Sequence, residues 1–407
     1  MSDRNDIVYV IPRPEIGGAE KQLLRLIEHM DSSRFRATVI CLDGGGSLLD
    51  EYEAIADEVV VLRRRGLFDV ITFARLLGHI RRIRPTTVHT TLYIANLFGG
   101  WAAKLAGVPR IVVSQRGLGI DPQHSKIKRA LHALFNSLIG QLADVRLANS
   151  QAVADKMASY GWTRTQVIHN GILDRPKASC EKLSELRKEL GITDGQVVLT
   201  AVSRIDPKKD LLTMLRAFRL VETQHPQSCL LVAGDGFPRY LEDLKNEASR
   251  LNIASKVRFL GFRNDIPDLL AITDISLLSS ITEGLPNAIL ESMLQATPVV
   301  STAVGGVPEL VDHGVEGYLV APGDHEGFAR RVTELIENPV RRGSMGIFGR
   351  TKALSEFGIQ NTVEKTTALY YAPNSKQEPD PSVQRSEKQH SGAVWKSITS
   401  KKWAKSA

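Results

Sequence analysis

Short β-rich runs alternate with longer helical patterns along this chain, and the alternation occurs in two successive series. The first series of expected strands comprises Ile7–Ile11, Ala37–Leu42, Val59–Leu62, Thr87–Thr90, Ile111–Ser114, Arg146–Ala148 and Gln166–His169. The second comprises Val197–Ser203, Cys229–Ala233, Val257–Leu260, Ile275–Leu278, Pro298–Ser301 and Gly317–Val320. Alternation at this spacing predicts parallel sheets with helices on both faces. Because 407 residues suffice for two such units, we expect an α/β protein with two doubly wound domains.

Breaks in these patterns suggest the domain boundaries. Residues 174–196 show only a weak helical pattern and carry Pro176, Gly191 and Gly195, so we expect a linker there. The first domain would then cover residues 1–175, and the second would begin at residue 176. Residues 374–407 are rich in Ser, Lys, Gln and Pro, and this composition predicts a disordered basic tail.

The positive charge of the chain is unevenly distributed. Of a net charge of +7, residues 1–175 hold 23 Lys and Arg against 17 Asp and Glu, and residues 374–407 hold seven against three. The surplus either only keeps the protein soluble or faces an anionic partner: a phosphorylated substrate, a membrane surface or nucleic acid. No nucleic-acid-reading motif is recognisable, so we expect no nucleic-acid partner. The lack of a spanning apolar run and the acidic N-terminus predict a cytoplasmic protein.

Two motifs follow the first expected strand of each series, at the sheet edge where doubly wound folds bind ligands. Gly17 and Gly18 open a helix, and adjacent glycines either form a tight turn or let the backbone approach a ligand. They are not part of a G-x-G-x-x-G pattern, which disfavours a nicotinamide dehydrogenase. Arg204 and Lys209 either lie on a solvated basic loop or converge on one anion, such as a diphosphate.

The stretch from Glu283 to Glu291 is the most informative motif. Pro286 suits the first position of a helix, which leaves Glu283 in the preceding loop and Glu291 inside the helix. The two carboxylates suit hydrogen bonds to sugar or ribose hydroxyls. An anion would be held by the amides of the helix start, formed by Leu285, Pro286, Asn287 and Ala288.

Together these motifs resemble those of the retaining GT-B glycosyltransferases of family four. The resemblance covers residues 7–371 and rests on GGAEK, AVSRIDPKKD, LLVAGDG, VRFLGF, SSITEGLPNAILESM and PVVSTAVGGVPELV. It implies two Rossmann-like domains that face a cleft, the second over residues 176–355. It also implies a C-terminal helix, within residues 356–373, that crosses back to the first domain.

The resemblance implies roles for individual residues. Arg204 and Lys209 would clamp the donor diphosphate, and Glu283 would contact the transferred sugar; these three are the catalytic candidates. Glu291 would contact the ribose. The remaining donor-binding candidates lie at the base, the phosphates or the sugar, and the helix start: Phe262 and Arg263, Gly17 and Gly18, and Leu285–Ala288.

The leaving group of such a reaction gains negative charge in the transition state. No Asp-x-Asp pair occurs in the chain, so no divalent-metal site is apparent. Arg204, Lys209 and the helix amides would stabilise the charge instead. We therefore expect a metal-independent enzyme without a cofactor.

The chain departs from the family pattern at Arg116. Many family members carry a His after the fifth strand of the first domain, near the transferred sugar, and Arg116 occupies that place. His89 closes the preceding strand, and it either touches the substrate or belongs to the core or the cleft edge. We take Arg116 and His89 as candidates for contact with acceptor or sugar, and we expect His169 to be structural.

A basic amphipathic helix is expected over Gln123–Leu142. Its polar side carries Lys126, Lys128 and Arg129, and its apolar stripe contains Leu131, Leu134, Phe135, Leu138 and Ile139. The helix either packs on its own sheet or docks on anionic lipid, which would suit a lipid-linked acceptor. The patch at residues 63–68 allows the same two interpretations, and Trp395 and Trp403 in the tail suit a membrane interface.

The sequence therefore predicts a retaining hexosyltransferase that uses a nucleotide diphosphate sugar, with a UDP-sugar as the first expectation. The acceptor would be a lipid-linked or surface-polysaccharide saccharide, reached from the inner face of the cytoplasmic membrane through a peripheral contact with anionic lipid. Two alternatives stay open: a non-catalytic sugar-nucleotide-binding protein, which Arg116 in place of the His allows, and a GT-B nucleotide-sugar epimerase.

Overall fold

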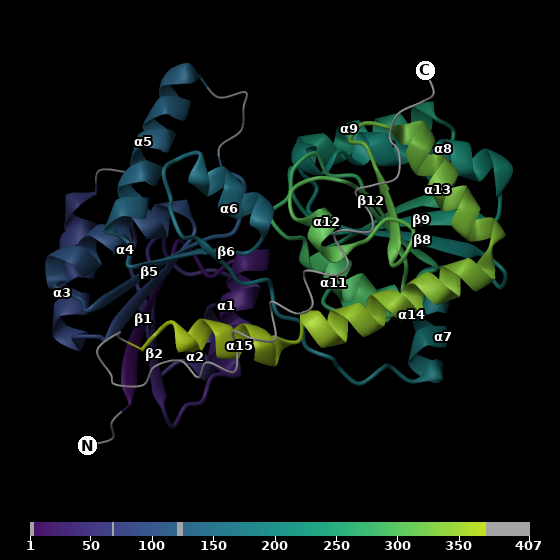
Figure 1. Cartoon of the computed structure of the whole chain (residues 1–407). Coiled ribbons are helices and arrows are strands. Elements are labelled where there is room, and N and C mark those ends of the chain that lie inside the picture. Colours follow the sequence, from purple (N-terminus) through teal and green to yellow (C-terminus); the bar gives the residue numbers. More distant parts are fainter. Residues whose placement is uncertain (1–3, 67–68, 120–124, 372–407) are drawn as a thin grey trace, which may run out of the picture. The chain divides into compact units, whose positions relative to one another are not determined.

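Two parallel sheets contain all the strands of the described chain (Figure 1). The structure is a computed structural model that describes residues 4–66, 69–119 and 125–371. The first sheet has the order β3-β2-β1-β4-β5-β6-β7, with β1 (Asn5–Ile11), β2 (Phe35–Cys41), β3 (Glu58–Val61), β4 (Thr87–Thr91), β5 (Arg110–Gln115), β6 (Val145–Ala148) and β7 (Gln166–Val167). The second has the order β10-β9-β8-β11-β12-β13, with β8 (Val197–Val202), β9 (Ser228–Ala233), β10 (Val257–Gly261), β11 (Ile275–Leu278), β12 (Val299–Thr302) and β13 (Gly317–Val320). The predicted α/β class with two doubly wound sheets is confirmed.

Helices connect successive strands within each sheet. Those of the first series are α1 (Gly18–Glu28), α2 (Leu49–Ile55), α3 (Val70–Ile83), α4 (Tyr93–Ala106), α5 (Lys126–Leu142) and α6 (Gln151–Ala158). In the second series the connections are α8 (Leu211–Gln224), α9 (Pro238–Arg250), α10 (Ile266–Ala271), α11 (Asn287–Leu294) and α12 (Val307–Leu310). Helix α7 (Cys180–Glu189) precedes β8, and three helices follow β13: α13 (His325–Glu337), α14 (Pro339–Glu356) and α15 (Ile359–Ala368). Several begin at a side-chain cap: the hydroxyl oxygens of Ser125 and Ser150 accept hydrogen bonds from amides three residues on.

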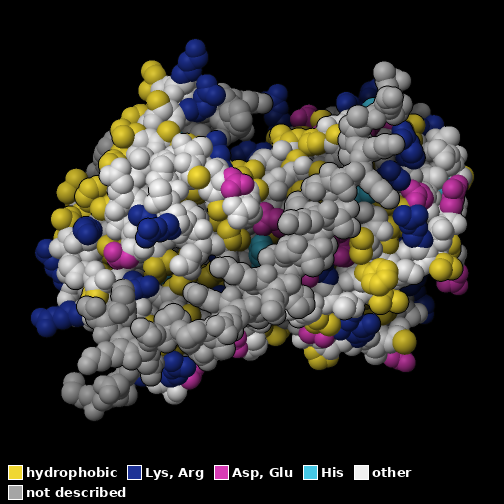
Figure 2. Space-filling model, viewed as in Figure 1, with side chains coloured by type: hydrophobic (Ala, Val, Ile, Leu, Met, Phe, Trp, Pro, Cys, Tyr) yellow, Lys and Arg dark blue, Asp and Glu magenta, His cyan; other side chains and the backbone are white. Residues whose placement is uncertain are grey.

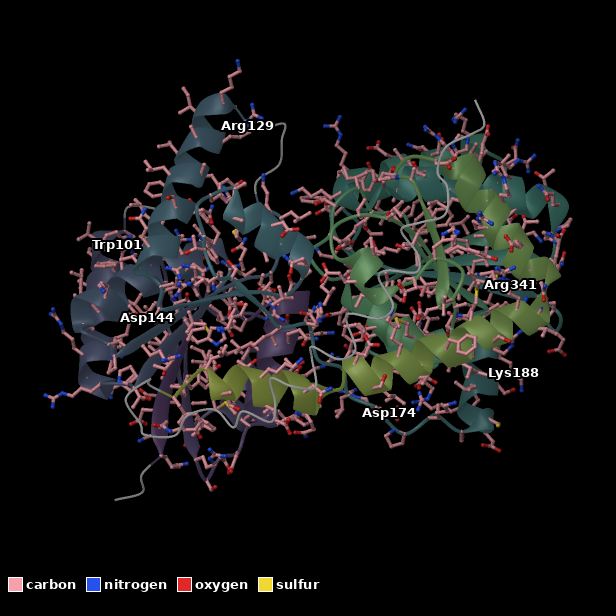
Figure 3. The ribbon with its side chains drawn as sticks, viewed as in Figure 1. Trp101, Arg129, Asp144, Asp174, Lys188 and Arg341 are labelled. Atoms are coloured by element: carbon pink, nitrogen blue, oxygen red, sulfur yellow. The ribbon has the colours of Figure 1, made fainter. Side chains whose placement is uncertain are left out.

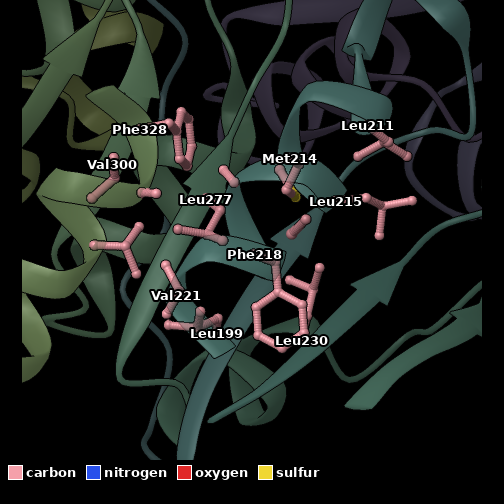
Figure 4. Close-up of a cluster of buried hydrophobic side chains, with 14 of the residues drawn as sticks. Leu199, Leu211, Met214, Leu215, Phe218, Val221, Leu230, Leu277, Val300 and Phe328 are labelled. Atoms are coloured by element: carbon pink, nitrogen blue, oxygen red, sulfur yellow. The ribbon is translucent and has the colours of Figure 1, made fainter. Parts of the chain in front are cut away.

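The core of the second domain shows why these segments fold as they do. In α8, apolar side chains recur every three or four residues at Leu211, Met214, Leu215, Phe218 and Val221, which places them on one face of the helix (Figure 4). They pack against strand residues in the same buried cluster, including those of β8, β9 and β11. Burying each large apolar side chain contributes roughly 1.5–3 kcal/mol, so this contact fixes the helix on the sheet.

The expected linker is in part a helix of the second domain. Within residues 174–196, α7 places Leu186 and Leu190 in a buried cluster with Val198 and Cys229. The linker prediction is therefore wrong for residues 180–189. One buried leucine within a ten-residue helix, followed by Leu190 at its C-cap, gives only a faint apolar period, which explains why the sequence pattern is weak.

The end of the described chain packs on the first domain. Helix α15 contacts α1, and Ile172 pairs with Gly358 in a parallel bridge. Tyr370 is buried, and its carbonyl oxygen accepts a hydrogen bond of 3.3 Å from Oγ1 of Thr87. An ion pair of 2.9 Å between Arg350 of α14 and Asp174 holds the segment that leaves the first domain.

Some expectations lie outside the described residues. These are the tail from residue 374, with Trp395 and Trp403, residues 67–68 of the basic patch, and residues 123–124 at the start of the expected amphipathic helix. Within the described ranges, no helix is both long enough and apolar enough to span a membrane.

Candidate active site

The site candidates gather where the strand order of each sheet reverses. These reversal points, between β1 and β4 and between β8 and β11, are where doubly wound folds bind ligands beyond the carboxyl ends of the strands. Gly18 follows β1, Arg204 and Lys209 follow β8, and Glu283 follows β11. The topology therefore brings residues that are far apart in sequence to the same kind of edge.

A pocket of about 230 Å³ has walls from both domains. The first domain contributes Gly18, Ala19, Arg116, Asn149 and Asn170, and the second contributes Val202, Lys209, Leu278, Glu283, Gly284, Leu285, Pro286, Asn287 and Ala288. Eight of the residues predicted from the sequence therefore meet at one pocket. Arg204, Glu291, Gly17, His89, Phe262 and Arg263 do not line it.

Lys209 and Glu283 form the charged pair of this pocket. The Lys209 Nζ lies 2.5 Å from Oε1 of Glu283, and the two side chains are 23% and 10% exposed. The Ser280 hydroxyl donates a second hydrogen bond, of 2.6 Å, to the same carboxylate. The Ser279 hydroxyl lies 2.9 Å from the Lys209 carbonyl oxygen and ties the loop after β11 to the loop after β8. The carboxylate is thus held in a defined orientation.

Arg204 is available for a ligand. Its side chain is exposed, and it forms no hydrogen bond or ion pair with any residue that the structure describes. Arg204 lies five residues before Lys209 in the loop that follows β8. The end of this loop forms a short 3-10 helix, Pro207–Lys209. Asp206 begins that turn, since its carboxylate accepts a hydrogen bond of 2.9 Å from the Lys208 amide.

Helix α11 begins one residue later than predicted, at Asn287, with Pro286 at the cap position. The loop before it approaches the first domain closely: a Cβ atom added to Gly284 would lie 2.4 Å from the carbonyl oxygen of Arg116. Only glycine allows this approach, because no real Cβ contact is so short. Residues 285–288 line the pocket, so the amides that a helix start leaves without intrahelical partners lie at its wall.

An asparagine network crosses the pocket, and the sequence analysis did not find it. Nη2 of Arg116 donates to Oδ1 of Asn170 at 2.6 Å, and Nδ2 of Asn170 donates to Oδ1 of Asn287 at 2.6 Å. Nδ2 of Asn287 in turn donates to the Gly18 carbonyl oxygen at 3.3 Å. The one available signal was the His169-Asn170-Gly171 turn, which we interpreted as structural.

Four donor-binding candidates lie away from the pocket wall. Glu291 is on the face of α11 toward α1, where Nη2 of Arg25 lies 3.7 Å from its Oε1, and burial raises the pKa of Glu291. Phe262 is exposed after β10, and Arg263 is paired with Asp265. Gly17 caps α1 without facing the pocket.

His89 lies in the interior of the first domain, so its prediction as a residue on the cleft side is corrected. It is 4% exposed, and its Nδ1 lies 2.8 Å from the hydroxyl of Tyr370. Burial, with a smaller effect from Arg116, lowers the pKa of His89 to about 3. The ring of Tyr370, near the end of the described chain, packs against that of His89, which is neutral and enclosed.

His169 lies at a contact between the domains. Its Nε2 is 2.9 Å from Oε2 of Glu309, which also accepts hydrogen bonds from the amides of Gln151 and Ala152 at the start of α6. Burial alone would raise the pKa of Glu309, but these hydrogen bonds outweigh it, so the pKa is lowered. Among the described residues, no group of three or more His, Cys, Asp or Glu side chains is arranged to hold a metal ion.

Comparisons with known proteins agree with this arrangement. Residues 183–352 match the family described as glycosyl transferases group 1, and residues 16–173 match glycosyltransferase family 4. A mannosyltransferase of Corynebacterium glutamicum, named as GDP-mannose-dependent and as acting on a monoacylated phosphatidylinositol monomannoside, is 31% identical over 88% of this chain and 94% of its own. An Escherichia coli protein named UDP-Gal:alpha-D-GlcNAc-diphosphoundecaprenol alpha-1,3-galactosyltransferase is 25% identical over 89% of this chain and 96% of its own.

A solved structure extends the likeness to three dimensions. HepE of Anabaena, in complex with UDP and glucose, superposes with a TM-score of 0.80 and is 25% identical. The match covers 90% of this chain and 99% of that chain, so it includes both sheets and the pocket between them.

Proposed function

Since the chain belongs to the group 1 glycosyltransferases and has the GT-B fold, we propose that it transfers a hexose from a UDP-sugar to a lipid-linked saccharide with retention of anomeric configuration. The observation that carries the proposal is the pocket in which Lys209, Glu283 and the start of α11 face Gly18 and Arg116. A UDP donor and a lipid-linked acceptor are favoured by the printed name of the Escherichia coli relative and by the UDP and glucose in the HepE complex.

The proposed reaction exchanges one bond at the anomeric carbon. The bond from that carbon to the phosphate oxygen breaks, and its electron pair stays on the departing nucleoside diphosphate. The acceptor oxygen bonds the carbon, and its proton goes to the departing phosphate oxygen. Arg204, Lys209 and the amides at the start of α11 would stabilise the charge that develops there, which is the largest catalytic effect available to such a site.

Glu283 would orient the transferred sugar rather than attack it. Both of its contacts, from Lys209 and from Ser280, are made to Oε1 and fix the carboxylate, which leaves Oε2 without a hydrogen-bond partner in the described chain. A contact from Glu283 to sugar hydroxyls uses the remaining oxygen lone pairs. If the acceptor oxygen attacks the anomeric carbon from the face that the diphosphate leaves, the configuration is retained without a protein nucleophile.

The direct test is a screen of nucleotide sugars for thermal stabilisation, followed by product analysis. A ligand that binds only the folded state raises the melting temperature, by an amount that grows with its concentration over Kd. We expect a UDP-sugar to give the largest rise, and proton NMR of the product to show the anomeric configuration of the donor. Binding without transfer to any acceptor would favour the non-catalytic alternative, and conversion of the nucleotide sugar itself would favour an epimerase.

We expect transfer to continue without divalent metal. The positive charges that would replace a metal ion are those of Arg204 and Lys209, as argued above, together with the α11 amides. The rate with excess EDTA should stay within about twofold of the untreated rate, because these groups are part of the chain. A rate that vanishes with EDTA and returns with Mg²⁺ or Mn²⁺ would contradict this prediction.

Replacing Glu283 and Glu291 with glutamine, one at a time, should affect different properties of the enzyme. Glu291→Gln should mainly weaken UDP binding, because a ribose contact is similar in ground and transition states. Glu283→Gln should mainly lower kcat, because the geometry changes at the sugar. Calorimetric titration with UDP, together with kcat for both variants, separates the roles. Equal losses of UDP affinity in the two variants would show that the division is wrong.

We also propose a peripheral contact with anionic lipid through α5. The apolar stripe of this helix divides: Ile139 is buried in the core, whereas Leu131 and Leu134 are 47% and 53% exposed, as is Ile127 at 73%. Basic and hydrophobic side chains lie together over α5 in the space-filling view (Figure 2), and Arg129 lies near its outer end (Figure 3). A helix that exposes both kinds of side chain suits an interface with anionic lipid.

A further inference from the structure

Arg116 carries a positive charge that has no counterion at contact distance among the described residues. Its Nη2 donates one hydrogen bond, to Asn170, and its Nε is buried without a partner. It forms no ion pair with any residue in the described part of the chain. Burial lowers the pKa of Arg116 to about 10, and Glu20 and Tyr52 oppose this only in part, so the group remains charged at neutral pH. A buried charge normally has a counterion, because leaving it unpaired is costly.

Two ionisable groups, Glu20 and Tyr52, act on Arg116 electrostatically, but neither forms an ion pair with it at contact distance. Burial raises the pKa of Glu20, which influences Arg116 from beyond ion-pair distance. Tyr52 is neutral, because burial raises its pKa well above the ordinary value.

The remaining carboxylate of the pocket is already engaged. Glu283 is held by Lys209 at 2.5 Å and by Ser280 at 2.6 Å. The donor diphosphate, for its part, has Arg204 and the amides of α11 as partners in the proposed function. Arg116 is therefore a surplus cation on the pocket wall opposite Lys209 and Glu283, which belong to the other domain.

We propose that Arg116 binds an anionic oxygen group of the substrate other than the donor diphosphate. The group is either a carboxylate on the transferred sugar, as in a hexuronic acid, or a phosphate of the acceptor. A guanidinium fits both, because its fork of N–H donors matches two oxygens of one group. Asn170 positions the fork by holding Nη2. This inference rests on the proposed function, because it takes the pocket to be the donor site.

The test measures affinities by calorimetry for the full-length wild type and for Arg116→Gln. The donor arm compares UDP-glucose with UDP-glucuronic acid. The acceptor arm, with UDP present, compares methyl N-acetylglucosaminide with N-acetylglucosamine 1-phosphate. We expect the anionic probe of one arm to bind the wild type at least about tenfold more tightly than its neutral counterpart, as a charge-assisted pair allows. In Arg116→Gln this preference should disappear, while the affinity for UDP changes less than about threefold.

The other possible results of these titrations distinguish failure of the inference from failure of the proposed function. If neither anionic probe is preferred, or if a preference survives in Arg116→Gln, the inference is wrong although the proposed function stands. A tenfold loss of UDP affinity in Arg116→Gln would also overturn it, by assigning Arg116 to the diphosphate. If the wild type does not bind UDP at all, the proposed function fails and the inference fails with it.

A stability measurement separates this role from a structural one. Glutamine ends at about the position of Nε, so Arg116→Gln removes the charge together with the Nη2 hydrogen bond to Asn170. Because a buried charge without a contact partner costs more than one hydrogen bond contributes, the ligand-free variant should melt at the same temperature as the wild type or higher. A lower melting temperature would contradict the claim that the charge has no counterion at contact distance. Arg64→Gln is the matched control: Arg64 is paired with Asp43 at 2.7 Å, so this variant should lose stability and keep every probe preference.

Discussion

Replacing Lys209 with alanine should lower kcat by roughly 10²–10³-fold, the usual effect of removing one preorganised charge-stabilising donor. The effect has two physical sources. The departing diphosphate loses a cation, and Glu283, only 10% exposed, loses its counterion and its orientation. Arg204→Ala should have an effect of similar size, although Arg204 holds no other residue in place among those described. The measurement is a steady-state assay with the nucleotide sugar found in the thermal screen.

UDP affinity distinguishes the two sources. If Lys209 contacts the diphosphate, Lys209→Ala should bind UDP less tightly, whereas an effect through Glu283 alone would leave UDP binding unchanged. Lys245→Ala makes the same substitution on the exposed face of α9 and should behave like the wild type. Activity within about threefold of the wild type for both Lys209→Ala and Arg204→Ala would contradict the proposed clamp.

Removing the three cations at the start of α5 should weaken binding to anionic vesicles by roughly a hundredfold. Each Lys or Arg close to such a surface contributes about 1 kcal/mol, so Lys126, Lys128 and Arg129 together account for about 3 kcal/mol of binding free energy. The measurement is co-sedimentation of the wild type and the triple alanine variant with vesicles of varied anionic lipid content. Binding should also fall at about 0.5 M salt, because counterions screen these charges.

The control for this experiment removes the same charge elsewhere. Lys177, Lys188 and Lys245 are exposed and belong to the second domain or its approach, and their triple alanine variant should bind vesicles like the wild type. Replacing the exposed Ile127 with asparagine should weaken binding without changing the charge, because Ile127 would insert among the acyl chains. If binding of the wild type to vesicles depends neither on lipid charge nor on salt, the proposed membrane contact is wrong, and α5 only packs on its sheet.

The sequence by itself determined the elements and the order in which they wind. All thirteen strands of the described residues lie where the β-rich runs predicted them, with small shifts at their ends, because strand and helix periodicities are properties of neighbouring residues. It also located the loops after β8 and β11, since motifs at strand ends keep their place in any doubly wound sheet. Arg204, Lys209 and Glu283 could therefore be selected from their positions, while their expected roles came from the family resemblance.

Only the tertiary structure decided which side chains meet across the pocket and which are enclosed. Asn170 lies beside Asn287 because two loops from different domains approach each other, and no local pattern encodes that distance. His89 is enclosed because the last residues of the described chain cover β4, and Leu186 is buried because the second sheet offers α7 a partner. Arg116 has no counterion at contact distance because Glu283 is engaged by Lys209 and Glu20 acts on it only from farther away. Burial and pairing are sums over residues distant in sequence, which is why periodicity and motif spacing could not give them.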